Sequence, residues 1–178
     1  MKEFLRKIKL IDSFKLQLPI EKSRFIENLK ANVDEGDTGY FSGVGDFFDR
    51  SDIHYRGKVH HEGFKIKKKG KMFDQNMSMA TTQGTYKKSG DGVLVEGEVN
   101  GFSRMMIPFY IFAALFYLMF FTILVSTDNS DSGLSFIGLP FLALHAIFML
   151  GVPYFIMRRG VKRMKYDLER EFYFLTKK

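Results

Sequence analysis

The chain has 178 residues, enough for one small domain beside any membrane-spanning segments. It contains no cysteine, which excludes disulfides, thiolate metal sites and cysteine nucleophiles, and its four histidines limit any histidine-based metal site. The formal net charge is +7, and residues 158–178 alone hold 8 Lys or Arg against 3 Asp or Glu. The excess is therefore partly a topological signal and does not by itself indicate a nucleic-acid partner.

The first elements expected are a strand and a helix. Apolar and polar residues alternate over 13–18 and predict a strand, which Pro19 ends because proline cannot donate to a β-ladder. Phe25, Ile26 and Leu29 then recur at helical spacing among charged residues. This pattern predicts a short amphipathic helix over 21–31.

A Gly-, Asp- and Ser-rich segment over 34–52 predicts a loop, with a short strand at 39–44. In and beside it lies one cluster that resembles a metal site, formed by Asp46, Asp49, Asp52 and His54. Oxygen ligands suit a hard cation, but the spacing is not that of an EF-hand, and a solvated turn explains the same residues. We expect no bound metal or other cofactor, with this cluster as the alternative.

Four further strands are expected before residue 104. The alternating segments are 53–59, 64–67, 80–87 and 92–100, with turns at 61–63 and at the SGDG sequence of 89–92. Residues 1–104 therefore predict an α+β domain, made of a helix and an antiparallel meander.

Five lysines lie within seven positions after the turn at 61–63: Lys65, Lys67, Lys68, Lys69 and Lys71. One interpretation is an edge strand whose charges prevent aggregation. The other is a basic patch that docks on anionic lipid headgroups. Aromatic residues do not interleave with the lysines and no recognition helix is evident, so we expect no nucleic-acid binding.

Two apolar runs dominate the rest of the chain. Residues 105–125 and 134–157 contain no Asp, Glu, Lys or Arg, and each is long enough as a helix to cross a hydrocarbon core of about 30 Å. The loop between them, 126–133, is too short to hold a domain. We therefore expect a two-helix transmembrane hairpin in a multi-pass membrane protein.

One polar residue stands out within these runs. His145 lies midway along the second run, at the depth where a polar group is most costly in a bilayer. In an antiparallel hairpin Tyr117 lies at a similar depth, which predicts a hydrogen bond between the two. The structural interpretation is a bond between helices, and the functional one is a proton-relay or ligand site.

The tail, 158–178, predicts a basic amphipathic helix. Five apolar residues follow one face at 3-4-4-3 spacing, namely Val161, Met164, Leu168, Phe172 and Leu175. This stripe can pack on the N-terminal domain, which we favour, or meet a partner helix or the membrane interface. The helix can also extend the second run as a stalk, with Gly160 allowing a bend.

Basic residues set the expected orientation. Arg158, Arg159, Lys162 and Arg163 follow the second run, Arg104 precedes the first, and the loop has no Lys or Arg. Because Lys and Arg are retained on the cytoplasmic side, both termini are predicted to be cytoplasmic. On size and simplicity, we expect a bacterial inner membrane.

The sequence predicts a class of protein more than an activity. We expect a non-enzymatic membrane protein whose cytosolic domain is an interaction or ligand-sensing module, with a protein partner or as a homo-oligomer, and in contact with the lipid bilayer and its anionic headgroups. One alternative is a membrane-bound enzyme or small-molecule binder whose pocket uses His54, Asp46, Asp49 or Tyr55. A second alternative is an oligomeric channel or transporter subunit.

Overall fold

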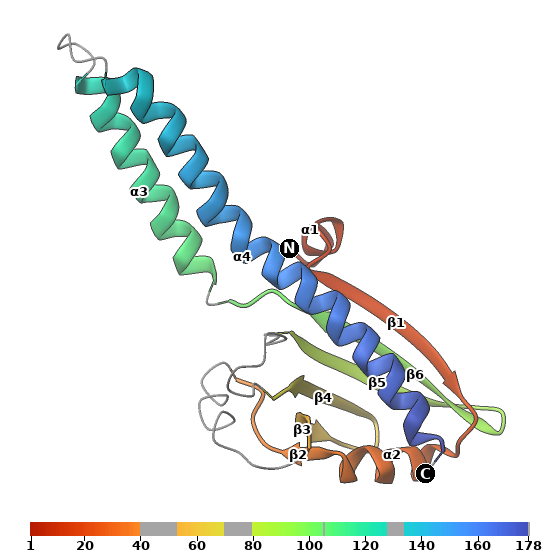
Figure 1. Cartoon of the computed structure of the whole chain (residues 1–178). Helices are drawn as coiled ribbons and strands as arrows, with labels where there is room; N and C mark the ends of the chain where they lie inside the picture. The colour runs from red at the N-terminus through yellow and green to blue at the C-terminus, as the bar shows by residue number, and fades with distance from the viewer. Residues whose placement is uncertain (40–52, 70–79, 105, 128–133, 178) are drawn as a thin grey trace. The chain divides into compact units, whose positions relative to one another are not determined.

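The computed structural model describes residues 1–39, 53–69, 80–104, 106–127 and 134–177 (Figure 1). The chain divides into two compact units. The first, called here the sheet unit, comprises Met1–Phe102 together with Met157–Lys178. The second, called the helical hairpin, comprises Ser103–Ile156. The tail that follows the second apolar run thus belongs to the same compact unit as the sheet.

The sheet unit is built on one six-stranded sheet with the order β1-β6-β5-β4-β3-β2. Its strands are β1 (Ile11–Leu18), β2 (Val33–Glu35), β3 (Tyr55–Val59), β4 (Gly63–Lys68), β5 (Thr81–Ser89) and β6 (Gly92–Asn100). All neighbours are antiparallel except β2 and β3, which are parallel. The sheet is therefore mixed, and the expected antiparallel meander describes only β3 to β6.

The strands follow the period-two pattern of a half-buried sheet. In β6, Val93, Val95 and Val99 are buried, while Glu96 and Glu98 on the other face remain partly accessible. The turn before β6 is the expected hairpin, with Ser89 paired to Gly92. Gly90 has a φ of +59° there, a backbone conformation that glycine adopts without steric cost.

Two helices accompany the strands at the start of the chain. The helix α2 (Lys22–Ala31) buries Phe25, Ile26 and Leu29 against the sheet, as its amphipathic spacing predicted. The helix α1 (Lys2–Lys7) was not predicted, since a six-residue helix with one buried residue, Leu5, has no visible period. The strand β2 was also not predicted, and it overlaps the start of the segment 34–52 that was expected to be a loop.

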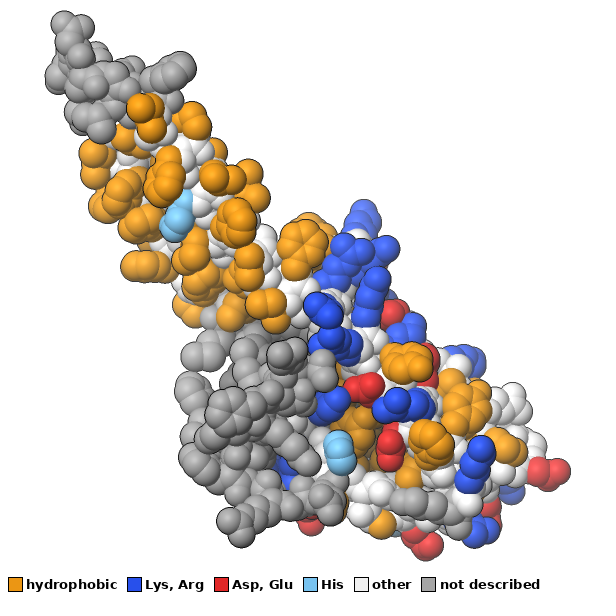
Figure 2. Space-filling model, viewed as in Figure 1, with side chains coloured by type: hydrophobic (Ala, Val, Ile, Leu, Met, Phe, Trp, Pro, Cys, Tyr) orange, Lys and Arg blue, Asp and Glu red, His pale blue; other side chains and the backbone are white. Residues whose placement is uncertain are grey.

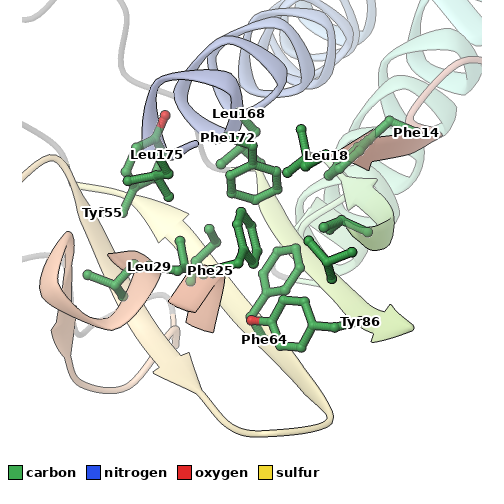
Figure 3. Packing of buried hydrophobic residues seen from close by; sticks show 14 of the residues in the cluster. Phe14, Leu18, Phe25, Leu29, Tyr55, Phe64, Tyr86, Leu168, Phe172 and Leu175 are labelled. Carbon is green, nitrogen blue, oxygen red and sulfur yellow. The ribbon is translucent and has the colours of Figure 1, made fainter. Parts of the chain in front are cut away.

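The tail completes the core of the sheet unit. All five residues of its apolar stripe are at most 1% exposed and belong to the same buried cluster as the sheet and α2. Phe172 lies at the centre of this cluster (Figure 3). Its ring centroid is 6.0 Å from that of Phe14, 5.4 Å from Phe25 and 5.6 Å from Phe64. Of the placements left open by the sequence, the structure thus shows packing on the protein's own sheet.

The helical hairpin consists of α3 (Met106–Thr127) and the first part of α4 (Leu134–Leu175). The helix α4 continues through Pro140, Pro153 and Gly160 into the sheet unit, so the second apolar run and the tail are one helix. Both helices are long and apolar enough to cross a membrane. Their large apolar side chains are mostly exposed, as the hydrophobic surface in Figure 2 shows.

Candidate functional sites

The polar pair within the helical hairpin is present. Tyr117 Oη and His145 Nδ1 lie within hydrogen-bond distance at 2.9 Å, and the two rings meet edge to face with centroids 5.9 Å apart. The ring of Phe141 stacks on His145 at 6.4 Å. The hydroxyl donates when Nδ1 is unprotonated, and the imidazole donates in the other tautomer.

This pair joins the two helices of the hairpin. Tyr110 donates to the Leu150 carbonyl at 3.4 Å, and Gly138 admits Leu124 so closely that a Cβ there would lie 2.8 Å from a Leu124 methyl group. Neither helix carries an Asp or Glu within its apolar run, so no carboxylate of the described hairpin residues accompanies His145. The geometry therefore favours a bond that fixes helix register over a proton relay.

The structure describes only one member of the predicted acidic cluster, His54. Asp46, Asp49 and Asp52 lie outside the described residues, as do positions 40–44 of the strand expected at 39–44, while His54 immediately precedes β3. Within the part of the chain that the structure describes, no three His, Asp or Glu side chains converge as metal ligands. The structure therefore adds nothing in favour of a metal at this cluster.

The lysines of the run between Lys65 and Lys71 lie in different environments. Lys68 pairs with Asp167 on α4 at 2.8 Å, and Lys69 is 5% exposed and pairs with Asp34. Lys67 donates to the Gly39 carbonyl at 3.2 Å, Lys65 is exposed, and Lys71 lies outside the described residues. Lys68 and Lys69 thus hold the sheet unit together, which leaves Lys65 as the only described member free to form a basic patch.

The pocket expected between the meander and α2 is filled by side chains. Phe25 packs edge to face on Tyr86 and on Phe172, and Tyr55 is itself part of the buried cluster (Figure 3). Burial raises the pKa of Tyr55 and of Tyr86 well above the ordinary value for tyrosine. At Tyr55 the negative charges of Asp167 and Glu171 raise the pKa further. Tyr55 is therefore a core residue of the sheet unit, whereas His54 is exposed just before β3, and Asp46 and Asp49 lie outside the described residues.

The opposite, outward face of the sheet is polar and was not anticipated as a site. A shallow cavity of about 700 Å³, largely open to solvent, lies where α1 adjoins β1, β6 and β5. Its charged side chains are Lys2, Arg6, Lys15, Glu96 and Glu98. The alternation of residues in β6 predicted that Glu96 and Glu98 share this face. The cavity beside them was not predicted, because α1 forms one of its walls and the sequence did not indicate this helix.

The two glutamates are held in their charged forms by neighbouring cations. Hydrogen bonds from Lys87 and Lys15 lower the pKa of Glu96 from 4.5 to about 2. At Glu98 burial acts in the opposite direction, but the bonds from Arg6 at 2.6 Å and Lys2 at 3.0 Å together keep its pKa below the ordinary value. These ion pairs tie α1 to the sheet.

The cations that follow the second apolar run are differently placed. Arg159 and Lys162 are exposed and Arg158 is half-buried. None of the three has an acidic partner among the described residues, whereas Lys165, one turn further, binds Asp12 at 3.0 Å and the Ser13 carbonyl at 2.9 Å. Lys165 therefore helps to hold the sheet unit together. Arg158, Arg159 and Lys162 form no such ion pair and are available to bind another molecule.

Comparisons with protein-family models, with curated proteins and with solved structures find no significant match for this chain.

Proposed function

We propose that this chain is an integral membrane protein in which a two-helix hairpin anchors a cytoplasmic interaction module formed by the sheet unit. The observation that carries the proposal is the continuity of α4. Its first part presents exposed apolar residues, and its last part supplies the buried stripe of the sheet unit, without a linker between them. Such a helix anchors the module to the bilayer firmly.

The basic residues support an orientation with both termini in the cytoplasm. Arg104 precedes α3, and Arg158, Arg159, Lys162 and Arg163 follow the apolar part of α4, while 126–133 contains no Lys or Arg. Both ends of the hairpin then emerge on the same side, as a single sheet unit made from residues 1–102 and 157–178 requires.

The surface of the module supports binding to another protein or to a second copy. Tyr166, Tyr173 and Phe174 are exposed along the side of α4 opposite its buried stripe, and the Arg170 guanidinium lies 5.9 Å over the Tyr166 ring. Tyrosine and arginine are the residue types that dominate binding energy in interfaces. The filled core beneath them favours a surface contact over an enclosed ligand pocket.

Single-cysteine labelling tests the topology, because the natural chain has no cysteine. In intact cells, an impermeant maleimide is expected to label Ser130→Cys, and to label Thr176→Cys only after the membrane is opened. Labelling at position 176 in intact cells would contradict the orientation. Release of the chain from membranes by alkaline carbonate would contradict membrane insertion itself.

A photo-crosslinking residue tests the interaction. Placed at Tyr173, it is expected to form an adduct larger than the 20.7 kDa chain in native membranes, whereas the same residue at the exposed Lys58 on β3 is the control. Mild detergent extraction should also yield a species larger than one chain. A monomer without adducts would contradict the interaction module.

The cavity on the outward face supports a second candidate, the binding of a small polar anion. Its three cations outnumber its two carboxylates, although each cation is engaged in an ion pair that the anion would have to displace. Thermal unfolding in the presence of phosphorylated small molecules tests this candidate, with Arg6→Ala as the control. An unchanged unfolding temperature throughout would remove it.

A further inference from the structure

The N-terminal helix α1 is held in one orientation on the sheet unit. Leu5 is buried beneath it, and the Leu10 amide donates to the Leu5 carbonyl at 2.9 Å. Lys2 and Arg6 both bind Glu98 of β6. The side of α1 opposite to Leu5 therefore has a defined position and faces away from the sheet.

This segment lies at the end of the sheet unit where the chain leaves for the hairpin and returns from it. The Gly101 amide donates to the Leu10 carbonyl at 2.9 Å. A Cβ on Gly101 would lie 2.4 Å from Val161 Cγ2 and 2.9 Å from the Met157 carbonyl oxygen, so these backbones are in close contact. Gly101 stands five residues before the start of α3, and Met157 is the last residue of the second apolar run.

The exposed side chains at this end are of two kinds. Met1 is 81% and Phe4 is 63% exposed, although both are large and apolar. Lys7 and Lys9 are exposed and, like Arg158, Arg159 and Lys162, have no acidic partner among the described residues. Glu3 is the only acid on α1. Figure 2 shows Lys and Arg side chains gathered in this part of the surface.

We propose that α1 is an interfacial anchor that binds anionic lipid headgroups. Phe4 and Met1 insert at the level where acyl chains meet headgroups, and the unpaired cations of α1 and α4 bind lipid phosphates. Aromatic and aliphatic side chains beside Lys and Arg are the composition of helices that lie in this interface. The inference rests on the proposed membrane insertion of the hairpin, and it adds a third membrane contact that sets how the module faces the bilayer.

Depth-dependent quenching tests this inference. A fluorophore is attached at Glu3→Cys, which leaves Phe4 and the basic residues intact, and the full chain is placed in nanodiscs. The discs contain phosphatidylcholine, alone or with about one third phosphatidylglycerol, and carry a quencher either near the headgroups or at the bilayer centre. We expect position 3 to be quenched by the shallow label and more strongly in anionic discs.

Two further labelled positions separate the inference from the proposal on which it rests. Leu118→Cys in the middle of α3 should be quenched by the deep label, and Glu27→Cys on α2 should not be quenched by either. Quenching at 118 with none at 3 would overturn the anchor alone. Absence of quenching at 118 would overturn membrane insertion.

Matched substitutions then test the two kinds of side chain. Phe4→Ser should at least halve the quenching at position 3 in both lipid compositions. Lys7→Glu with Lys9→Glu should lower it in anionic discs to the level seen in phosphatidylcholine. Lys30→Glu on α2 with Lys58→Glu on β3 makes the same charge change at two other exposed positions and should have no effect. An equal loss with this control pair would overturn a specific role for α1.

Discussion

The two parts of α4 use similar side chains in opposite surroundings. Between Ile137 and Ile156 large apolar residues are exposed around most of the helix. Beyond Met157 the aliphatic residues and Phe172 form one stripe that is buried in the sheet unit, while three aromatic residues on the other side, Tyr166, Tyr173 and Phe174, remain exposed. A uniform apolar surface suits a lipid solvent, and a single stripe suits one protein face. Four substitutions, in order of decreasing expected effect, extend this comparison to the helical hairpin and the sheet unit as a whole.

Phe172→Ala is expected to destabilise the sheet unit by about 3–5 kcal/mol, because it leaves a cavity among Phe14, Phe25 and Phe64. Phe174→Ala, on the exposed side of the same helix, should change the free energy of unfolding by no more than about 0.5 kcal/mol. Urea unfolding of the solubilised chain, followed by near-ultraviolet circular dichroism, measures both. Equal effects would contradict the placement of the stripe.

Leu118→Arg is expected to oppose membrane insertion by about 2.5–3.5 kcal/mol, since it places a charge at the middle of α3. Phe174→Arg introduces the same charge at an exposed apolar position in the sheet unit and should leave insertion unchanged. The fraction of chain that resists alkaline extraction measures the effect. Normal insertion of Leu118→Arg would mean that this exposed apolar surface does not face lipid.

Tyr117→Phe should weaken contact between the two helices of the hairpin by about 0.6–1.7 kcal/mol through loss of the bond to His145. A double-mutant cycle with His145→Leu isolates this coupling from other effects of each change. Insertion should remain intact in all three variants. Additive effects of the two single substitutions would show that the contact contributes no stability.

Glu96→Gln should have the smallest effect and a defined pH dependence. Because the pKa of Glu96 in the folded protein is lowered from 4.5 to about 2, its ion pairs stabilise the fold above about pH 4.5, and this contribution disappears as the pH falls through about 2. The stabilities of the natural chain and the variant should therefore converge in acid. Because both pairs are exposed, high salt should also reduce the difference. A difference in stability that persists in acid would show that the ion pairs of Glu96 are not its cause.

Periodicity predicted the longer elements well. The valines of β6 lie at alternate positions between 93 and 99, and α2 places Phe25, Ile26 and Leu29 on one face, so the local pattern alone identifies each. The elements missed are short and depend on neighbours. The strand β2 has three residues and is defined by its parallel pairing with β3, while α1 is defined by ion pairs to Glu98, a residue more than 90 positions away.

The candidate sites also differ in whether they depend on local sequence or on residues distant in the chain. Equal depth in an antiparallel hairpin was enough to pair Tyr117 with His145. The lysine run could not be interpreted from its composition, because Lys68 and Lys69 find their partners at Asp167 and Asp34, on segments that the sequence does not place beside them. The outward cavity was missed for the same reason, since one wall of it is α1.

The sequence by itself determined that the chain has two apolar helices long enough to cross a membrane, a sheet-forming segment before them and an amphipathic helix after them. These properties depend on hydrophobic content and period, which are local. Only the tertiary structure decided that the amphipathic helix continues α4 and supplies Phe172 to the centre of the core. Several surfaces can bury one apolar stripe, and the choice among them depends on the shape of residues distant in the chain.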